Sequence, residues 1–186
     1  MLAAIPVGNE HQGAPGFNKN SFAGWTTDAS KCDTSERVLI RDSTTAVKKN
    51  KRDCTINSGT WLSVFDQVST TDPQDLIVVQ LVSPKEAWES GAWSWSQQRR
   101  DAFANDTSDR RTLSVMTRTL NTVRGDKDPA NWLPPASSQV CRYVSEWLSV
   151  KARWGLSMDQ AESNAISTTL ANKCPGLIVA AWPIVS

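Results

Sequence analysis

The stretch that decides the fold is Asp75-Leu-Ile-Val-Val-Gln-Leu-Val-Ser-Pro-Lys-Glu-Ala-Trp88. Apolar residues run almost without interruption from Leu76 to Val82, and the β-branched ones favour an extended backbone. A short apolar run that ends at Ser83-Pro84 predicts a buried strand. Lys85-Glu-Ala-Trp88 then changes from polar to aromatic residues, as the first turn of a helix does. We therefore predict a buried strand followed directly by a helix.

The composition is that of a globular protein with little net charge. The chain has 186 residues, of which 39% are hydrophobic and 21% charged, and this is enough for one domain with its own core. The formal net charge is +1, so overall charge gives no reason to expect nucleic acid as a partner. Nine tryptophans suit either a Trp-rich core and surface or a stacking surface for bases or sugars.

The chain contains a single histidine, His11, in the glycine-rich segment 8–16. A site with two histidine ligands is therefore excluded, and a Ser-His-Asp or Cys-His site would have to use this one residue. We expect His11 to be a solvated loop residue. Residues 1–24 are predicted to form an irregular N-terminal arm, anchored on the core by Phe17, Phe22 and Trp25.

The four cysteines indicate an oxidising compartment. They are Cys32, Cys54, Cys141 and Cys174. None has the Cys-x-x-Cys spacing of a zinc site, and an even count spread along the chain suits two disulfides. No apolar stretch approaches the roughly 20 residues of a transmembrane helix, so we expect no membrane association. The segment 1–7 is too short for a secretory signal, and we expect Met1 to stand where the signal of a secreted, extracellular protein was removed.

Two strands and a basic run are predicted in the first third of the chain. Arg37–Arg41 alternates so that its Val and Ile share one face of a strand. Cys54–Phe65 is predicted as a second strand, bent at Gly59, and a Cys32–Cys54 bond would staple the hairpin that the two strands could form. The run Lys48–Arg52 suits a solvated turn or, alternatively, a phosphate contact.

Helices are predicted to dominate the C-terminal half. One helix covers 94–104, with Ser94 or Ser96 as its cap, and a short strand follows at 113–116. A second helix runs to Gly155, since apolar residues recur at helical spacing: Val140, Tyr143, Val144, Trp147 and Leu148.

A third helix in this half begins at the predicted capping box Ser157-Met-Asp-Gln160. A Cys141–Cys174 bond would tie the last two helices into an antiparallel pair. Residues 175–186 are predicted to be a hydrophobic tail packed against the body.

Many short segments match one known family, in the same order along the chain. They are Leu2–Val7, Phe17 with Phe22 and Trp25, Cys32-Asp-Thr34, Arg37–Asp42, Ser58–Trp61, Lys85–Trp88, Ser90–Trp93, Phe103–Asp106, Gly125–Pro129, Trp132–Pro135, Cys141-Arg-Tyr143 and Val150-Lys151. On these segments the chain resembles the secreted HNH-type nuclease-like proteins of actinobacteria and fungi, which are related to the C-terminal domain of GmrSD restriction endonucleases. The four cysteines fall on cysteine positions of that family, which supports both pairings.

The resemblance implies an α+β fold, with a single domain over residues 25–174. This domain would contain a ββα-metal core, small β-hairpins, a C-terminal helical pair and two disulfides. In active members, an Asp-x-Asp-His motif lies on a strand just before the segment that matches Lys85–Trp88. The histidine is the general base for water, and the preceding aspartate helps to hold a divalent metal such as Mg²⁺ against the phosphate. An asparagine on the next strand orients the base, and a later polar residue completes the metal site.

The match at Lys85–Trp88 sets the register of this motif. The histidine position falls on Gln80 and the aspartate before it on Val79. The central asparagine falls on Thr112, and the later polar position keeps its character as Asn121. An amide does not take a proton near neutral pH, and an alkyl side chain offers no lone pair to a metal. The general base and the metal ligand are therefore lost together.

Two further positions differ from the family and one agrees with it. The first aspartate of the motif falls on Ile77, and an arginine that is common after Cys-Asp-Thr falls on Ser35. The basic residue Arg124 is retained. A conserved scaffold with so many functional positions replaced indicates a pseudoenzyme.

We therefore expect a secreted, catalytically inactive protein of binding or effector type, without a metal cofactor. Its partner is either a protein or a nucleic acid. For nucleic acid, Trp93 and Trp95 could stack on bases while a group of arginines contacts phosphates: Arg99, Arg100, Arg110, Arg111 and Arg124.

The alternative is an active metal-dependent DNA or RNA nuclease with a rebuilt site. The carboxylates that could then hold the metal are Asp75, Glu86, Asp126 and Asp128. A Trp-rich sugar-binding module is a third possibility, but no motif supports it.

Overall fold

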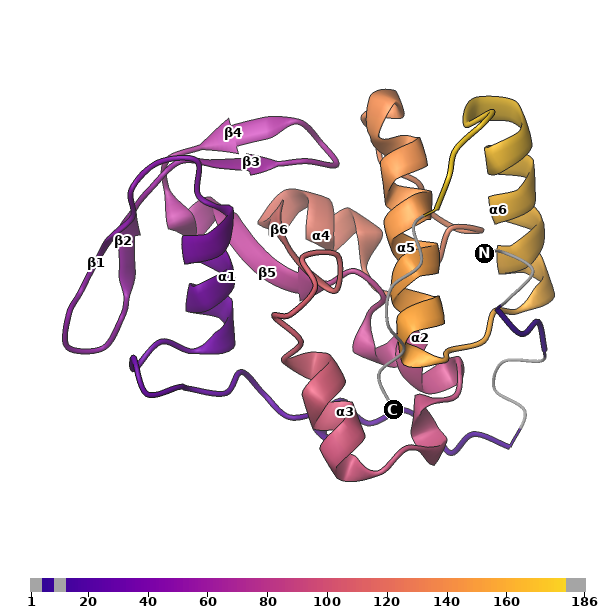
Figure 1. The fold of residues 1–186 in the computed structure, drawn as a ribbon, viewed down its shortest axis with the longest axis horizontal. Coiled ribbons are helices and arrows are strands. Elements are labelled where there is room, and N and C mark those ends of the chain that lie inside the picture. The colour runs from indigo at the N-terminus through magenta and orange to yellow at the C-terminus, as the bar shows by residue number, and fades with distance from the viewer. Residues whose placement is uncertain (1–4, 9–12, 180–186) are drawn as a thin grey trace.

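The computed structural model describes residues 5–8 and 13–179 and shows one α+β domain (Figure 1). The α-helices are α1 (Thr34–Asp42), α2 (Pro84–Glu89), α3 (Gln97–Ala104), α4 (Arg118–Arg124), α5 (Val140–Trp154) and α6 (Gln160–Lys173). The strands are β1 (Lys48–Lys49), β2 (Ile56–Ser58), β3 (Trp61–Ser63), β4 (Val68–Thr70), β5 (Leu76–Gln80) and β6 (Leu113–Thr117). Short 3₁₀ helices are η2 (Lys19–Ser21), η3 (Pro73–Asp75), η4 (Ala92–Ser94) and η5 (Ser137–Gln139).

The predicted central strand is confirmed as β5, which pairs antiparallel with β6. The register joins Leu76 to Thr117 and Gln80 to Leu113. The chain leaves β6 directly into α4, because the side chain of Thr117 accepts a hydrogen bond from the amide of Leu120 and caps the helix. Two paired strands followed at once by a helix therefore form the centre of the molecule.

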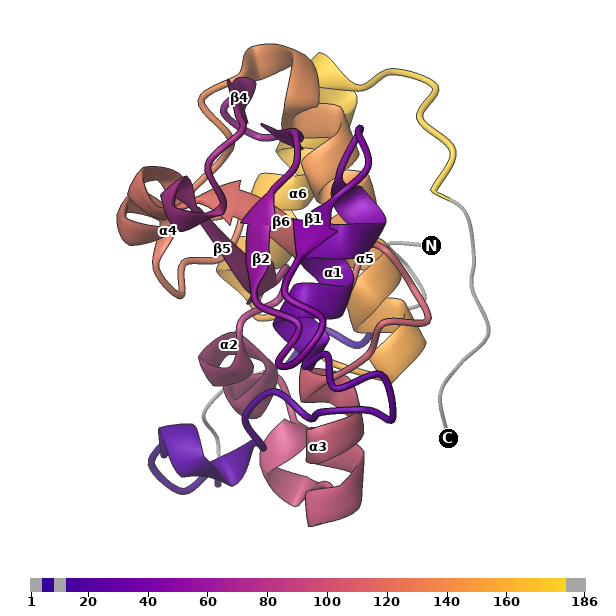
Figure 2. The same cartoon turned by 90° about the vertical axis from the view of Figure 1, so that its left-hand side faces the viewer.

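The two faces of the β5–β6 pair contact different helices. Leu76 and Val78 lie in one buried cluster with Val38 of α1. Val79 lies in a second, larger cluster that includes Leu120 of α4 and residues of α5. Figure 2 shows α1 and α4 on opposite sides of β5. Alternate residues of a strand point to opposite faces, so this strand is covered by helices on both sides.

The prediction of a strand over 37–41 is wrong, because these residues belong to helix α1. Asp33 accepts a hydrogen bond from the amide of Glu36, and Glu36 accepts one from the amide of Asp33, each at 2.8 Å. This capping box fixes the first turn of the helix. The local cap outweighs the strand preference of Val38 and Ile40.

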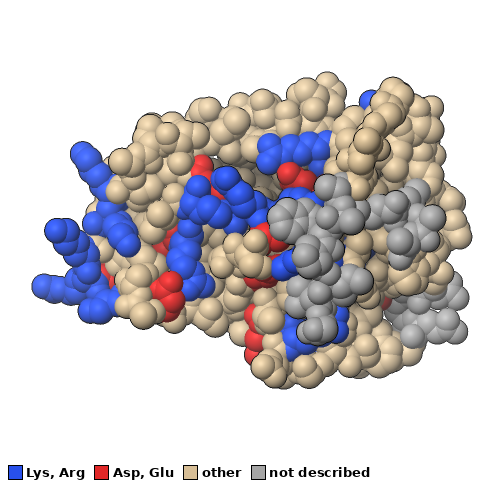
Figure 3. All heavy atoms as spheres, in the orientation of Figure 1, with Lys and Arg blue, Asp and Glu red and all other residues tan. Residues whose placement is uncertain are grey.

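The predicted bend at Gly59 separates two small hairpins. β2 pairs with β1, and β3 pairs with β4. A Cβ atom on Gly59 would lie 2.5 Å from the Trp61 ring, so only glycine fits there. The basic run Lys48–Arg52 forms β1 and the following turn and is exposed, and Figure 3 shows Lys and Arg atoms projecting at this end of the molecule.

Both disulfides are present with the predicted partners. Cys32–Cys54 joins the residue before the α1 cap to the chain just before β2. It therefore links a helix to a hairpin, and the expected staple between two strands is wrong. Cys141–Cys174 joins the first turn of α5 to the end of α6 and ties the helical pair, as predicted.

Helix α5 ends where the sequence predicted, since Gly155 takes a left-handed conformation with φ of 66°. Helix α6 begins at Gln160, two residues later than a cap at Ser157 would place it, because Asp159 is the cap and accepts the hydrogen bond from the amide of Glu162. Ser96 caps α3 and Ser83 caps α2. None of the helices in the described ranges is long and apolar enough to span a membrane.

The N-terminal arm packs on the body, as its aromatic residues predicted. Phe22 is buried in the larger cluster, where its ring lies 5.9 Å from that of Phe103. Phe17 contacts Trp88 with a ring separation of 6.3 Å. His11 and residues 180–186 of the predicted tail lie outside the described residues.

Candidate functional site

The end of β5 carries the two positions where the resemblance placed a metal ligand and a general base. Val79 is buried within the apolar cluster that also contains Met116 and Leu120. The side-chain amide of Gln80 donates a hydrogen bond of 3.0 Å to the carbonyl of Ala104, at the end of α3. Both side chains therefore have structural contacts of their own.

The neighbouring elements supply the other two positions of the motif. Thr112 precedes β6, is fully buried, and donates from its hydroxyl to Asp106 at 3.1 Å. Asn121 is half-buried on α4. A hollow of about 270 Å³ is lined by Val79, Gln80 and Asn121 but not by Thr112. We call this hollow the β5-end pocket. The structure thus brings together three of the four predicted positions.

The β5-end pocket offers few groups that could act on a phosphate ester. Its side-chain oxygens come from Ser83, Gln80, Asn121 and Asp126, and only the last is a carboxylate. A serine or amide oxygen can support a hard cation, but Mg²⁺ sites usually rest on at least one carboxylate. Neither an amide nor an alkyl group can take a proton from water at neutral pH. Asp126 is the one group of the pocket that could do so.

Arg124 is a structural residue rather than a surface phosphate contact, which corrects the sequence prediction. It is 1% exposed. Its Nη2 donates to the carbonyls of Leu81 and Gln80, at the end of β5. The guanidinium therefore fastens α4 to the chain that leads from β5 into α2.

Arg99 and Arg100 of α3, which were also predicted to contact phosphates, bond to neighbouring parts of the chain. The Arg99 guanidinium lies 4.7 Å from the centre of the Trp95 ring and donates to the carbonyl of Trp154. Arg100 lies 5.5 Å from the Trp88 ring and donates to the carbonyl of Ser21 at 2.8 Å. These contacts attach the N-terminal arm and α5 to α3.

Arg110 and Arg111 lie in the loop between α3 and β6, away from the β5-end pocket. Arg110 is exposed and pairs with Asp42, the last residue of α1, at 2.8 Å. Arg111 pairs with the buried carboxylate of Asp109 at 2.7 Å. Burial opposes ionisation of Asp109, but the Arg111 guanidinium outweighs it and lowers the pKa. Figure 3 shows acidic atoms lying among the basic ones on this face.

Three of the four carboxylates proposed for a rebuilt site share one hollow of about 340 Å³. Glu86, Asp126 and Asp128 line it, next to the β5-end pocket. Asp75 lies at the opposite end of β5, where its carboxylate accepts a hydrogen bond from Thr70 at 2.6 Å. One oxygen of Asp128 accepts three hydrogen bonds, including one from the Asn131 side chain at 2.9 Å.

Glu86 belongs to a buried charge cluster that the sequence analysis missed. The ammonium group of Lys151, on α5, lies 2.7 Å from Glu86 and 2.6 Å from Glu162. It also donates to the Ser90 hydroxyl at 2.9 Å and to the Ser157 carbonyl at 2.8 Å. We call Lys151, Glu86 and Glu162 the Lys151 cluster. The matched segments Lys85–Trp88 and Val150-Lys151 contain two of its members, and this coincidence was the available signal.

Ionisation in the Lys151 cluster is affected by its burial. Glu162 is fully buried and also accepts a hydrogen bond from the indole of Trp147. Burial raises the pKa of Glu162 to about 8, against the opposing effect of Lys151 and in the same direction as the charge of Glu86. Two carboxylates share one ammonium group, so one of them retains its proton more readily.

In the described ranges, three side chains of metal-ligating type have ligand atoms within 4.8 Å of one another: Cys32, Glu36 and Cys54. The two sulfurs are joined in a disulfide, so they are not thiolate ligands. The carboxylates near the β5-end pocket do not form such a group.

The chain is similar to a known secreted protein. The chain is 36% identical over 159 residues to an uncharacterized secreted protein of Arthroderma benhamiae, a match covering 86% of this chain and 76% of the relative. No protein-family model matches the chain, and no solved structure matches it. The relative is described as secreted, and the two disulfides of this chain also fit an extracellular protein.

Proposed function

Since the chain belongs to the same family of secreted proteins as the Arthroderma benhamiae relative, we propose that it is a secreted binding protein on an HNH-nuclease-like scaffold. On this proposal, β5, β6 and α4 are the ββα core. Val79 and Gln80 then stand at the positions of the metal ligand and the general base. The scaffold is kept and the hydrolytic chemistry is absent.

One observation carries the proposal: the order and contacts of β5, β6 and α4. An antiparallel pair leads directly into a helix, and the end of the first strand faces that helix across the β5-end pocket. Hydrolysis of a phosphodiester needs an activated water and a cation against the phosphate. Val79 and Gln80 supply neither, and both are already packed or hydrogen-bonded.

The test is cleavage of single- and double-stranded DNA and RNA with Mg²⁺, Mn²⁺ or Zn²⁺. The wild type is compared with a Val79→Asp, Gln80→His, Thr112→Asn variant. A Val79→Asp, Gln80→His variant is included because Thr112 is fully buried and a larger residue there could disturb folding. We expect an inert wild type and metal-dependent cleavage by at least one variant. Cleavage by the wild type would contradict the proposal.

The competing function is a metal-dependent nuclease with a rebuilt site. The observation in its favour is that Asp126 lines both the β5-end pocket and the acidic hollow beside it. Asp126 is exposed and has no structural ion pair in the described chain. If this function is correct, the wild type cuts and Asp126→Asn abolishes cleavage. Asp75→Asn is the matched control, because Asp75 lies at the far end of β5.

A further inference from the structure

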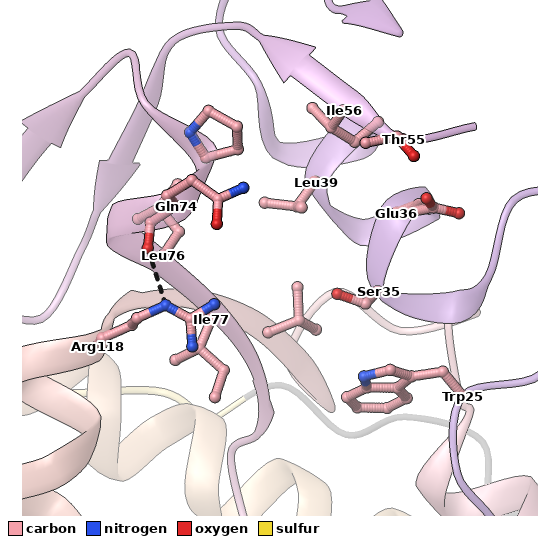
Figure 4. Close-up of a pocket in the computed structure, with 12 residues that line it drawn as sticks. Trp25, Ser35, Glu36, Leu39, Thr55, Ile56, Gln74, Leu76, Ile77 and Arg118 are labelled. Carbon is pink, nitrogen blue, oxygen red and sulfur yellow. Dashed lines mark hydrogen bonds between the residues drawn. The ribbon is translucent and has the colours of Figure 1, made fainter. Parts of the chain in front are cut away.

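A groove on the α1 side of β5 has no role in the scaffold described above. It has a volume of about 400 Å³ and lies between α1, β2 and the start of β5 (Figure 4). Its floor is apolar and includes Leu39, Ile56 and Leu76. This volume is within the range of roughly 300–1,000 Å³ that is usual for small-ligand sites. The groove is separate from the β5-end pocket, since the two have no lining residue in common.

The two sides of the groove carry different chemistry. Figure 4 shows Trp25, Ser35 and Glu36 on one side and Gln74 and Arg118 on the other. The Trp25 ring is half-buried, which leaves part of its surface open to the groove. An indole ring offers a planar stacking surface to an aromatic ligand.

Arg118 is a cation held in place beside the groove. Its Nε donates to the carbonyl of Gln74 at 2.8 Å. Within the described chain, its terminal nitrogens make no hydrogen bond and no ion pair. A guanidinium positioned by one bond, with two nitrogens available, is suited to a phosphate group.

Glu36 gives the opposite wall an acceptor. One of its carboxylate oxygens accepts the capping hydrogen bond from the amide of Asp33 at 2.8 Å, which fixes the side chain. The other oxygen remains for a ligand. A ligand that spans the groove therefore meets an aromatic surface and a hydrogen-bond acceptor on one side and a cation on the other.

We propose that this groove binds one nucleotide unit whose base carries an amino group. The base stacks on Trp25 and donates from its amino group to Glu36, while the phosphate contacts Arg118. The inference names a ligand for the proposed binding function, at a site distinct from the β5-end pocket. The nucleotide could be free or part of a single strand, because both present the same base and phosphate.

The experiment measures binding of cytidine 5′-monophosphate, uridine 5′-monophosphate and a short single-stranded oligocytidine to the full chain by calorimetry. The tryptophan indole N–H signals are followed by NMR, with Trp25→Phe identifying the signal of Trp25. We expect cytidine monophosphate to bind and to shift that signal. Tighter binding of the oligonucleotide than of the mononucleotide identifies a nucleic-acid strand as the source, and equal binding identifies the free nucleotide.

Three variants test the three contacts. Trp25→Ala should weaken binding about tenfold or more, because stacking is lost. Arg118→Gln alters an exposed residue and should weaken binding of both mononucleotides without affecting folding. Glu36→Gln keeps the capping hydrogen bond and should narrow the difference between cytidine and uridine monophosphate. The control is Arg142→Gln, an exposed arginine outside the groove.

Failure of this inference is separable from failure of the proposed function. Absence of binding by cytidine monophosphate, or binding that Arg118→Gln leaves unchanged, overturns the nucleotide site. Either result is independent of the cleavage assay, since no residue of the groove is altered in the Val79 and Gln80 variants. Cleavage by the wild type overturns the proposed function without touching the groove.

Discussion

The regions on the two sides of helix α2 differ in the side chains that they bury. On the side of β5, the β5-end pocket has an alkyl side chain, Val79, beside the amide of Gln80. On its other side, the Lys151 cluster buries three ionisable side chains, and the Lys151 ammonium group lies within 2.7 Å of both carboxylates. A buried charge is tolerated only when it is paired and hydrogen-bonded. The difference teaches that the buried carboxylate of Glu86 is held by an ammonium group, so Glu86 has a structural role.

The largest expected effect comes from removing the shared cation. Lys151→Met leaves Glu86 and Glu162 buried without a partner and should lower the free energy of unfolding by about 3–5 kcal/mol. Urea denaturation measures the change. Lys127→Met is the matched control, because Lys127 is exposed and bonds only to the Val123 carbonyl in the described chain. Equal effects of the two substitutions would show that the cluster is not what stabilises this region.

The second prediction concerns pH. The pKa of Glu162 is raised to about 8 in the folded protein, whereas the same carboxyl group in the unfolded chain has its ordinary pKa of about 4.5. The folded state therefore keeps a proton that the unfolded chain releases between these values. Stability from this group is complete below about pH 4.5 and is lost as pH rises through about 8.

Between these two pKa values, the free energy of unfolding should fall by up to about 1.4 kcal/mol for each unit of pH increase. Glu162→Gln should remove this pH dependence, because the amide does not titrate. The measurement is the difference in the free energy of unfolding between wild type and variant from pH 5 to 8. A difference that does not change with pH would contradict the raised pKa.

The third prediction reverses the comparison by placing a carboxylate at the end of β5. Val79→Asp should cost roughly 2–4 kcal/mol, since the new group enters an apolar cluster without an ammonium partner. Val123→Asp, at a valine that is 56% exposed on α4, is the control and should be nearly neutral. If Val79→Asp changes the free energy of unfolding as little as Val123→Asp does, water reaches the β5-end pocket well enough to solvate a carboxylate. The contrast with the Lys151 cluster would then be wrong.

The smallest effect is expected at the exposed pair of Arg110 and Asp42. Arg110→Ala should change the free energy of unfolding by less than about 1 kcal/mol, because the Arg110 side chain is 71% exposed and Arg41 also pairs with Asp42. Arg111→Ala should cost more, since its partner Asp109 is buried. Thermal denaturation of both variants checks this order.

The elements that the sequence predicted correctly are those with local signals. The apolar run of β5, the helix start that follows Ser83-Pro84 and the glycine that ends α5 all specify their structure within a few residues. The strand predicted over 37–41 is wrong because the capping box of Asp33 and Glu36, also a local signal, outweighs the strand preference of Val38 and Ile40. The start of α6 was misplaced for a similar reason, since both Ser157 and Asp159 can cap.

The candidate site was predictable only in part. The register set by Lys85–Trp88 brought Val79, Gln80 and Asn121 to one pocket, as expected. Five arginines were expected to form one group that contacts phosphates, but the structure separates them. Arg124 lines the pocket and is 1% exposed, whereas Arg110 pairs with α1 on the other side of β5. Closeness in sequence does not fix the face of a sheet on which a loop residue lies.

The sequence by itself determined the α+β class, the central strand, the two disulfide pairs and the exclusion of a site with two histidine ligands. The central strand and the exclusion of a two-histidine site follow from periodicity and residue counts, whereas the α+β class is what the family resemblance implied and the disulfide pairs rested on both kinds of reasoning. Only the tertiary structure decided that Lys151 joins Glu86 to Glu162 and that a groove opens between Trp25 and Arg118. Those partners lie at least 11 residues apart in sequence, and tertiary packing brings them together. The reason is physical: burial and pairing are properties of the space around a side chain, and a sequence states only its neighbours along the chain.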